Sequence, residues 1–583
     1  MKDYKAIYEE WLSNPYFDQE TKEELRAIRA DEKEIKERFY MDLEFGTAGL
    51  RGVIGAGINR MNIYTVRRAT QGLADYILEQ GGAERGVAIA YDSRRMSPEF
   101  SDEAARTLAA NGIKAYRFES LRPTPELSFA VRELGCIAGI NITASHNPPE
   151  YNGYKVYWED GAQFTPPHDK GVTEKVMAIT DLSAVRTMSR EEAEASGLYV
   201  TIGAEIDDKY IAQVKAQVVN QAAIDRMQDQ ISIVYTPLHG TGNIPARRVM
   251  KELGFEHVYV VPEQELPDGN FPTCPYPNPE IRQAMQKGID LCELVHPDLL
   301  LATDPDADRV GVAVKNGDDY LLLTGNEMGV LLLDYICKTR AARGEDLTKK
   351  VAVTTIVSSA MVDALAEEYG FELRRCLTGF KYIGEQIALL EAGGHPERYI
   401  FGFEESYGYL SGPHVRDKDA VNAVLLICEA AAWYAKKGMT LGDAIDALYA
   451  EFGCFCNAQK SFTFAGETGM EKMASLMSGL RTHPLQSVAG LPVEGFTDYE
   501  QDGTGLPKAN VLEYRLPGGA KLYCQKHCLY CNIHRRSSAG QCAAVRGGLC
   551  HAGGKTIRLG ELNQLQQPMY NAKVQQGRQA LHQ

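Results

Sequence analysis

The sequence lacks both an excess of basic residues and long hydrophobic runs. Lys and Arg number 62 against 78 Asp and Glu, which gives a net charge of −16 over 583 residues. A broad surface for nucleic acid or for an anionic membrane is therefore not expected, and an anionic ligand would need a local basic pocket. The apolar run at 420–435 is short and contains Asn422 and Glu429, so we predict a buried amphipathic helix there.

Export signals, a regular cysteine framework and solenoid repeats are also lacking. The first residues, MKDYKAIYEEWL, are charged throughout and have no apolar signal-peptide core, which predicts a cytoplasmic protein. Eight of the 13 cysteines are scattered between Cys136 and Cys456, as expected for reduced cysteines that lie mostly in the core. Nothing in the sequence indicates an obligate protein partner.

The composition is that of a globular protein with several domains. Apolar residues make up 44% and charged residues 24%, and the length exceeds what one hydrophobic core usually organises. Residues 1–40 are predicted to be helical, and 97–112 reads as a helix with Ser97 as N-cap and Gly112 at its end. Short β-branched runs, most of them ending in polar or Gly/Pro turns, predict buried parallel strands. These runs lie at 86–94, 136–145, 231–240, 257–263, 298–306, 349–359 and 398–406.

This alternation predicts an α/β fold that is repeated along the chain. Polar connecting stretches and changes of pattern near 205, 325 and 460 suggest the domain boundaries. The expected domains are 1–205, 206–325, 326–460 and 461–583. Ligands of open α/β sheets gather at the carboxyl ends of the strands, so the residues after each run are the first candidates for a site.

The stretch TDPDADRVG, residues 303–311, carries three acidic residues at alternate positions. On an extended backbone Asp304, Asp306 and Asp308 point to one side, where they would repel one another unless a cation lies among them. Hard oxygen ligands favour Mg²⁺. A helix–loop–helix calcium site does not fit, because its twelfth position would be Lys315 rather than Glu. A solvated acidic turn remains the alternative.

The stretch TASHNPPEYNGYK, residues 143–155, presents Ser145 at the end of a strand. The two prolines stiffen the turn that follows and would hold the hydroxyl at a set angle. In the structural alternative, Ser145 caps a helix and His146 packs beside it. A serine hydrolase is less well supported, since no G-x-S-x-G elbow surrounds Ser145. Lys155 is either a phosphate-neutralising or proton-transferring group or only a surface charge.

Three glycine-containing stretches are ambiguous when taken alone. FGTAGLRGVIGAG at 45–57 surrounds Arg51 with glycines that let a backbone approach an anion, but a turn between strands explains it as well. The same holds for HGTG at 239–242 and TGFK at 378–381. In GFEESYGY, Glu404 and Ser406 share a face if extended, either to hold sugar hydroxyls or simply as part of an edge strand.

In combination these motifs resemble the α-D-phosphohexomutases. FGTAGLRG, TASHNPPEYNGYK, TDPDADRVG, TGFK and GFEES occur in that order over about 360 residues, and the similarity covers roughly residues 1–523. The phosphoglucomutase branch, with its long bacterial phospho-sugar mutases and phosphopentomutase-like enzymes, is the most similar. The resemblance implies three similar mixed or parallel α/β domains and a smaller C-terminal α+β domain around a central cleft.

The resemblance also implies site residues. Ser145 would be carried as a phosphoserine and, with Asp304, Asp306 and Asp308, would hold Mg²⁺. Arg309 would assist these residues in relieving the charge on the transferring phosphoryl group. The substrate and proton-transfer residues would be Arg51, His146, Lys155, Lys381, Glu404 and Ser406. Neighbouring positive charge would lower the pKa of Lys155, and its neutral amine could then deprotonate the sugar hydroxyl.

The implied reaction interconverts glucose 1-phosphate and glucose 6-phosphate. Phosphate passes from Ser145 to the sugar, and the resulting glucose 1,6-bisphosphate, which also serves as activator, turns round and returns its other phosphate. Phosphomannomutase and phosphopentomutase activities remain alternatives, although Glu-Glu-Ser in the sugar loop favours glucose. A further alternative is an impaired, mutase-like protein that binds a phosphosugar.

The C-terminal tail departs from the family pattern. The expected Arg-Pro-Ser-Gly-Thr-Glu-Pro phosphate loop does not follow NVLEYRLPGGAKLY at 510–523. Residues 521–583 carry nine Lys and Arg against Glu561 alone, a charge of +8, whereas residues 1–520 carry −24. A shifted reading frame would explain this switch, and we expect weakened substrate binding and turnover. The alternative is a zinc site with the ligands Cys524, His527, Cys528, Cys531 and His534.

Overall fold

A computed structural model shows the chain as two compact units. The structure describes residues 3–46, 49–317, 319–461, 466–488, 490–501, 503–525, 528–535, 549–552 and 555–558. The first unit comprises Met1–Gly325 and Phe380–Thr440, and the second comprises Asn326–Gly379 and Leu441–Gln583. Among these described segments, no helix combines the length and apolar character that crossing a membrane requires.

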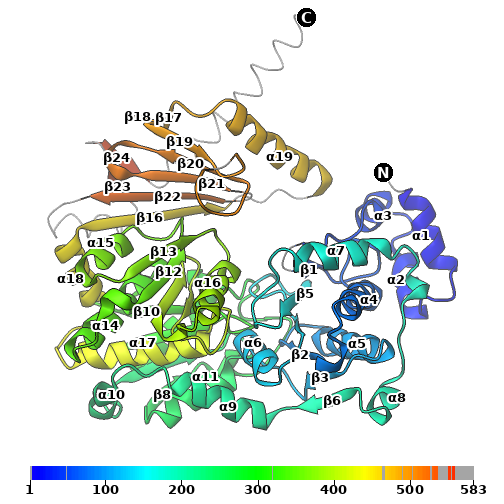
Figure 1. Cartoon of the computed structure of the whole chain (residues 1–583), viewed down its shortest axis with the longest axis horizontal. Coiled ribbons are helices and arrows are strands. Elements are labelled where there is room, and N and C mark those ends of the chain that lie inside the picture. The colour runs from blue at the N-terminus through cyan, green and yellow to red at the C-terminus, as the bar shows by residue number, and fades with distance from the viewer. Residues whose placement is uncertain are drawn as a thin grey trace, which may run out of the picture. The chain divides into compact units, whose positions relative to one another are not determined.

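The first unit contains a six-stranded mixed sheet with helices on both faces (Figure 1). Across the sheet the strands are β1 (Gly49–Val53), β5 (Tyr151–Trp158), β4 (Ala138–Ile142), β2 (Val87–Tyr91), β3 (Ala115–Phe118) and β6 (Tyr199–Ile202). The associated helices are α4 (Ile63–Glu79), α5 (Ser97–Ala110), α6 (Thr124–Glu133), α7 (His168–Ala178) and α8 (Arg190–Ala195). The central strands β2 and β4 are parallel and buried at every position, because helices cover both of their faces.

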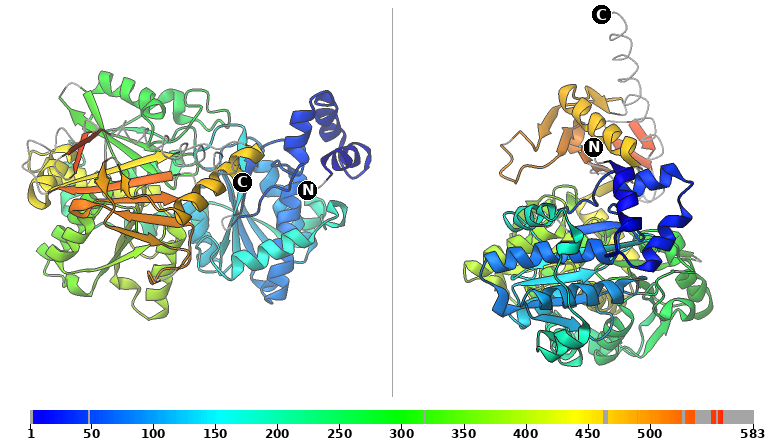
Figure 2. Two further views of the ribbon diagram at one scale, coloured as in Figure 1. Left: turned by 90° about the horizontal axis from the view of Figure 1, so that it is seen from above. Right: turned by 90° about the vertical axis from the view of Figure 1, so that its right-hand side faces the viewer.

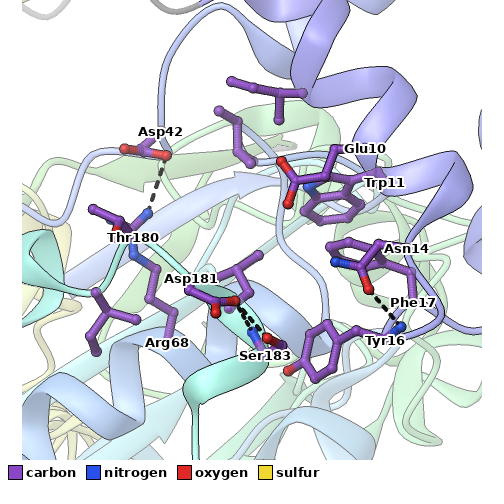
Figure 3. A pocket seen from close by; sticks show the side chains of 14 residues that line it. Glu10, Trp11, Asn14, Tyr16, Phe17, Asp42, Arg68, Thr180, Asp181 and Ser183 are labelled. Carbon is purple, nitrogen blue, oxygen red and sulfur yellow. Dashed lines mark hydrogen bonds and ion pairs between the residues drawn. The ribbon is translucent and has the colours of Figure 1, made fainter.

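Three N-terminal helices pack on the outside of this sheet domain (Figures 1 and 2). They are α1 (Tyr4–Ser13), α2 (Gln19–Ala27) and α3 (Glu32–Phe39). Their aromatic side chains form a core with Tyr64 of α4, in which Trp11 stacks on Phe17 at 4.1 Å. A small cavity of about 100 Å³ remains beside α1, bordered by the ion pair of Arg68 and Asp42 (Figure 3).

A second sheet of the first unit has five strands. Their order is β11 (Asp319–Leu323), β10 (Val310–Asn316), β9 (Leu299–Thr303), β7 (Ser232–Thr236) and β8 (His257–Val260). Its helices are α9 (Ala204–Lys215), α10 (Gln221–Met227), α11 (Asn243–Glu252), α12 (Pro262–Glu265) and α13 (Arg282–Val295). Strand β7 is parallel to β8 and β9, whereas β10 runs antiparallel to β9, so the chain reverses between β9 and β10.

The segment from residue 380 to 440 completes the first unit. It contains α16 (Phe380–Ala392), β14 (Tyr399–Glu404), β15 (Gly408–Leu410) and α17 (Ala420–Ala435), and β14 pairs with β15 as an antiparallel hairpin. Helix α17 has the predicted bounds and is buried on almost every face rather than on one. Its Glu429 carboxylate accepts hydrogen bonds from the backbone N–H groups of Val219, at 3.1 Å, and Asn220.

The second unit combines an α/β part with an antiparallel sheet. The α/β part has α14 (Gly325–Ala342), the parallel pair β12 (Val351–Thr355) and β13 (Glu372–Cys376), α15 (Met361–Tyr369) and α18 (Leu441–Phe452). The five-stranded sheet has the order β16 (Cys454–Ser461), β22 (Cys528–Arg535), β21 (Lys521–Gln525), β20 (Val511–Arg515) and β19 (Gly495–Asp498). Further elements are α19 (Gly466–Thr482), β17 (Ser487–Val488), β18 (Leu491–Pro492), β23 (Leu549–Ala552) and β24 (Lys555–Arg558).

The α/β fold class and the positions of all seven predicted strands are confirmed, with some local corrections. Strand β8 is not buried as expected, since its four residues are exposed or half-buried. Ser97 is not an N-cap: α5 begins at Ser97 after Met96, and the Ser97 hydroxyl donates to Asp92 instead. Gly112 does lie just beyond the end of α5, with a φ of +75°. Cysteines 136, 274, 292, 337, 376 and 428 are free and buried as expected, whereas 454 and 456 are disulfide-bonded.

Candidate active site

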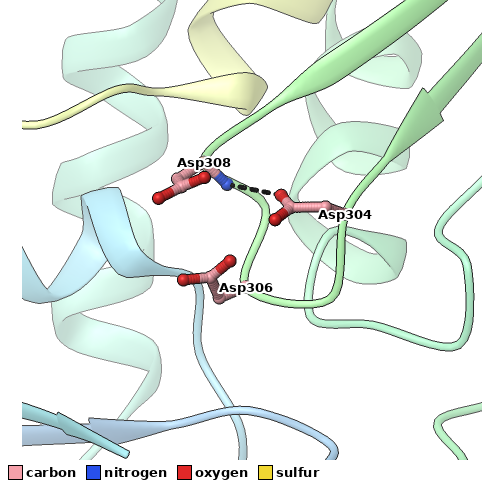
Figure 4. Close-up of side chains that lie close together, drawn as sticks. All are labelled: Asp304, Asp306 and Asp308. Carbon is pink, nitrogen blue, oxygen red and sulfur yellow. Dashed lines mark hydrogen bonds between the residues drawn. The ribbon is translucent and has the colours of Figure 1, made fainter. Parts of the chain in front are cut away.

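The acidic stretch after β9 forms a tight turn rather than an extended strand. Ala307 has a φ of +48°, and its N–H donates to the Asp304 carbonyl at 2.9 Å. The turn brings the carboxylates of Asp304, Asp306 and Asp308 together, with ligand oxygens within 4.8 Å of one another (Figure 4). The predicted cluster is therefore present, but a chain reversal and not strand alternation produces it.

Backbone hydrogen bonds from three other segments hold this turn, which lies between β9 and β10. The pairs are Thr124 N–H to Asp306 O at 2.9 Å, Thr241 N–H to Pro305 O at 2.8 Å and Ala420 N–H to Ala307 O at 3.2 Å. The HGTG stretch supplies one of them and approaches closely, since a Cβ on Gly240 would lie 2.5 Å from the Cα of Pro305. Glycine is needed there for close packing against the acidic turn.

The carboxylate oxygens fit a metal ion. Asp304 Oδ1 accepts from the N–H groups of Asp308, at 3.1 Å, and Arg309, at 3.0 Å. Asp306 Oδ1 and Asp308 Oδ1 are buried and have no hydrogen-bond partner among the described residues. Burial and the two neighbouring carboxylates raise the pKa of Asp304 well above its ordinary value. A cation among the three would relieve this repulsion, and the all-oxygen donor set suits a hard divalent ion.

Ser145 joins this cluster from the other sheet. It follows β4 with a φ of +52°, and its N–H donates to Thr143 Oγ1 at 2.8 Å. The hydroxyl donates to Asp304 Oδ2 at 2.8 Å and lies 3.0 Å from Nδ1 of His146. No helix begins at Ser145, so the helix-cap alternative was wrong. Because a left-handed backbone costs energy for a non-glycine residue, the surrounding loop must be held firmly.

Arg94 holds the Ser145 loop from inside the domain. Its buried guanidinium donates to the carbonyls of Ser145 at 2.5 Å, Pro148 at 2.8 Å, Tyr151 at 3.1 Å and Asn147. Its Nε lies 3.4 Å from a carboxylate oxygen of Asp92. A planar group with donors on two sides is suited to several carbonyls at once, so Arg94 fixes the course of the loop.

Lys155 and Lys418 neutralise part of the acidic cluster. Lys155 Nζ lies 2.7 Å from Asp306 Oδ2, and Lys418 Nζ lies 3.1 Å from Asp308 Oδ2. Burial favours the neutral amine of Lys155, but Asp306 and Asp308 outweigh it and raise its pKa. The expected lowering of this pKa by neighbouring positive charge was therefore wrong, because the carboxylates are closer.

The remaining basic groups line the same region of the first unit. Arg51 lies on β1, has an exposed side chain, and donates to Asn147 Oδ1 at 3.2 Å. Arg309 pairs with Glu280 at 2.7 Å. Burial, followed by the positive charges of Arg309 and Arg51, holds the pKa of His146 well below 6.5, so its imidazole is neutral.

The sugar-loop candidates occupy the turn between β14 and β15. Glu404 is the last residue of β14 and is buried, while Ser406 lies in the turn and is half-buried. The carbonyl of the neighbouring Tyr407 accepts from the Val310 N–H at 3.2 Å, which ties this turn to the strand after the acidic cluster. The expectation that Glu404 and Ser406 share one face of an extended segment was wrong, because the chain turns after Glu404.

Lys381 stands apart from these contacts. It is the second residue of α16, and its Nζ lies 5.2 Å from the ring centre of Tyr382. Burial lowers its pKa. Its expected part in binding therefore stays a prediction.

Sequence reasoning missed Arg94, Thr124 and Lys418. Arg94 had a signal, since DSRR at 92–95 forms the polar end of the predicted strand run at 86–94. Lys418 lies in RDKD, before an apolar helix, where alternating charges would also fit a surface turn. Thr124 had no local signal, because its partner Asp306 is 182 positions away in the chain.

The C-terminal hypotheses fall largely outside the described residues. Cys524 is free and buried in β21, and Cys528, Cys531 and His534 belong to β22. His527 and most of the tail lie outside the part that the structure describes. The shifted reading frame and the zinc site therefore both stay predictions.

Comparison with protein-family models finds three consecutive matches. The matched descriptions are phosphoglucomutase/phosphomannomutase alpha/beta/alpha domain I at residues 42–183, domain II at 208–317 and domain III at 324–452. The Ser145 loop lies in the first match and the acidic turn in the second. Glu404 and Ser406 lie in the third.

Curated relatives and solved structures agree with these matches. The chain is 35% identical over 494 residues to a phosphoglucomutase of Staphylococcus epidermidis, covering 82% of this chain and 88% of the relative. It is 36% identical over 493 residues to one of Staphylococcus aureus, covering 82% and 86%.

Two solved structures share the fold. A phosphoglucomutase/phosphomannomutase family protein from Burkholderia thailandensis has a TM-score of 0.60 at 19% identity, covering 86% of this chain and 95% of that one. The open form of the phosphoglucomutase parafusin from Paramecium has a TM-score of 0.63 at 17% identity, covering 87% and 93%. Together, the domain matches and the curated relatives show that this chain belongs to the α-D-phosphohexomutase superfamily, in its phosphoglucomutase branch.

Proposed function

We propose that the protein is a phosphoglucomutase, an intramolecular phosphotransferase that interconverts glucose 1-phosphate and glucose 6-phosphate. The observation that carries this function is the hydroxyl of Ser145, which donates to Asp304 within a cluster of three buried carboxylates. A hydroxyl that carries a phosphoryl group needs positive charge beside it, and a cation-binding cluster supplies the place for that charge.

The reaction consists of two phosphoryl transfers. In the first, the bond between phosphorus and Ser145 Oγ breaks and a bond to the 6-oxygen of glucose 1-phosphate forms. The product, glucose 1,6-bisphosphate, turns round within the site. In the second transfer its 1-phosphoryl group passes to Ser145 Oγ, and glucose 6-phosphate leaves. Added glucose 1,6-bisphosphate would rephosphorylate enzyme that has lost its phosphate.

Mg²⁺ is the cofactor that we assign to Asp304, Asp306, Asp308 and Ser145. When bound, it would withdraw charge from the transferring phosphoryl group. Oδ1 of Asp306 supports this assignment, since it has no hydrogen-bond partner among the described residues and a buried carboxylate oxygen without one is costly unless a cation meets it. Asp308 Oδ1 also lacks a hydrogen bond there and lies 3.8 Å from Arg309 Nε.

Proton movement is assigned to residues that contact Ser145 or the cluster. The Ser145 proton points to Asp304 before the reaction, and neutral His146, with Nδ1 at 3.0 Å from Ser145 Oγ, can take it when that oxygen attacks. His146 returns the proton when Ser145 Oγ next loses its phosphoryl group. The neutral amine of Lys155 takes the proton of the 6-hydroxyl in the first transfer, and the resulting ammonium gives that proton to the 1-oxygen when its phosphoryl group leaves in the second. Arg51 and Arg309 bind phosphate oxygens.

Sugar recognition is assigned to Glu404 and Ser406, with Lys381 on a phosphate. Their acidic and hydroxyl groups suit sugar hydroxyls, so a phosphosugar is the substrate class. The alternatives, phosphomannomutase, phosphopentomutase and an impaired sugar-phosphate-binding protein, are not favoured by relatives that are phosphoglucomutases. We further propose that the chain has four domains, at 1–205, 206–325, 326–460 and 461–583, and that the protein is cytoplasmic.

A coupled assay tests this function. Glucose 1-phosphate is converted in the presence of Mg²⁺ and glucose 1,6-bisphosphate, and glucose 6-phosphate is detected by its oxidation. Ser145→Ala is expected to abolish turnover and the phosphoserine peptide in mass spectra, whereas the exposed Ser196→Ala retains both. Mannose 1-phosphate and ribose 1-phosphate test the alternatives. A wild-type protein that turns over neither glucose phosphate would refute the proposal.

A further inference from the structure

The two carboxylate oxygens of Asp306 have different surroundings. Oδ2 accepts hydrogen bonds from the hydroxyl of Thr124 at 2.7 Å and from Lys155 Nζ at 2.7 Å. Oδ1 is buried and has no hydrogen-bond partner among the described residues. A carboxylate whose one oxygen is engaged twice cannot rotate freely, so the other oxygen is held in a set direction.

The direction of the Thr124 hydroxyl proton follows from a third residue. Asn141 Nδ2 donates to Thr124 Oγ1 at 2.7 Å. A hydroxyl has one proton, and because its oxygen already accepts from the amide, that proton is free to point at Asp306. Asn141, Thr124 and Asp306 each have 0% of their surface exposed, so bulk water does not compete for these bonds.

These contacts join the two sheets of the first unit. Asn141 lies on β4, four positions before Ser145, and Thr124 is the first residue of α6. Asp306 belongs to the turn after β9, in the other sheet. The Thr124 N–H also donates to the Asp306 carbonyl at 2.9 Å, so one residue holds both the backbone and the side chain of Asp306. The N-terminal end of α6 further favours a negative charge there.

We propose that Asn141 and Thr124 are positioning residues that select Oδ1 as the oxygen that Asp306 presents to the cation. This inference deepens the proposed function and rests on its metal site. Partners that orient a metal ligand in this way generally contribute tenfold to hundredfold to metal affinity or activity. Because Asn141 shares its strand with the approach to Ser145, the same pair would keep the carboxylate in register with the Ser145 hydroxyl.

The test replaces the hydroxyl of Thr124 without changing its shape much. Binding of Mn²⁺ to the full-length protein is measured by electron paramagnetic resonance, with no sugar present. Thr124→Val is expected to bind Mn²⁺ about tenfold to hundredfold more weakly. Thr124→Ser restores the hydroxyl and should restore most of the affinity. Thr107→Val is the matched control, because it makes the same change at a buried threonine of α5 whose hydroxyl has no partner among the described residues.

Activity and folding are measured on the same variants. In the coupled assay, Thr124→Val should need a proportionally higher metal concentration for half-maximal rate, with little change in the KM for glucose 1-phosphate. Unchanged thermal unfolding without metal would show that the variant is folded. Mn²⁺ affinity of Thr124→Val equal to that of wild type would overturn the inference, as would Thr124→Ser binding as weakly as Thr124→Val or a wild type that binds no Mn²⁺. A wild type that binds Mn²⁺ with the expected pattern but fails to isomerise glucose phosphates would sink only the proposed function.

Discussion

The replacement Arg94→Lys tests whether the Ser145 loop is held by the guanidinium or only by its charge. Lysine keeps the positive charge beside Asp92, at 3.4 Å in the wild type, so the buried ion pair is largely retained. It offers one nitrogen in place of a planar fork. Any loss of activity then reports the geometry of the hydrogen bonds and not the removal of a charge.

The magnitude follows from the acceptors. Arg94 Nη1 donates to the carbonyls of Pro148 and Tyr151, and Nη2 donates to those of Ser145 and Asn147. The single ammonium of lysine can reach only one of these two pairs of carbonyls. Two charge-assisted hydrogen bonds are therefore lost. At about 1.5–3 kcal/mol each, the loss is about 3–6 kcal/mol. Because Ser145 has a left-handed backbone, part of this loss should appear as a loop that leaves its productive conformation.

The assay measures kcat, KM and thermal unfolding on phosphorylated enzyme. We expect kcat to fall by at least about a hundredfold, which corresponds to about 2.7 kcal/mol, with a smaller change in KM. Arg95→Lys is the matched control, because the Arg95 side chain is exposed and, within the described part of the chain, donates only to the Pro149 carbonyl, at 3.2 Å. If Arg94→Lys keeps the kcat and the unfolding temperature of wild type, the four carbonyl contacts do not position Ser145 and the reasoning is refuted.

Three further predictions concern the metal, a helix cap and a buried carboxylate. Chelation with EDTA should abolish turnover and lower the unfolding temperature, since three buried carboxylates would then repel one another; full activity in EDTA would contradict the metal site. Although burial opposes it, hydrogen bonds from the Thr21 N–H and the Tyr64 hydroxyl lower the pKa of Asp18. The stabilisation by the Asp18 carboxylate is therefore present above the unfolded pKa near 3.8 and is lost as pH falls through the folded pKa. The loss of unfolding free energy in Asp18→Asn should therefore shrink below pH 4. A loss that is independent of pH would contradict this. Glu429→Leu should cost about 1–3 kcal/mol in unfolding free energy, because two backbone N–H groups lose their acceptor, and an unchanged denaturation midpoint would argue against that.

The strands and the acidic cluster could be predicted because their signals are local. Buried parallel strands are β-branched whatever packs on them, so the run at 298–306 reads as a strand without further information. Three carboxylates within five residues are close in almost any backbone conformation. For that reason the cluster of Asp304, Asp306 and Asp308 was expected even though the assumed extended backbone was wrong.

The supporting contacts could not be predicted because they depend on which segments meet. Thr124 reaches Asp306 across 182 positions, and Arg94 reaches the Ser145 loop across more than 50. The predicted direction of the pKa shift of Lys155 was wrong for the same reason. Whether this pKa is raised or lowered depends on whether Asp306 or a positively charged group is closer to the amine. Sequence motifs identify the groups that react, whereas the groups that orient them come from the packing of the two sheets.

The charges around Ser145 explain why the hydroxyl and the cation site must belong together. Lys155 and Lys418 offset two of the three carboxylates, and the charge of Arg309 is shared with Glu280. A phosphate on Ser145 would bring about two further negative charges within hydrogen-bonding distance of Asp304. Those charges exceed what the nearby ammonium groups can balance, so the phosphorylated serine is stable there only with a divalent cation among the carboxylates. Phosphorylation and metal binding should therefore each strengthen the other, because a cation among the three carboxylates would lie beside Asp304, which contacts the oxygen of Ser145.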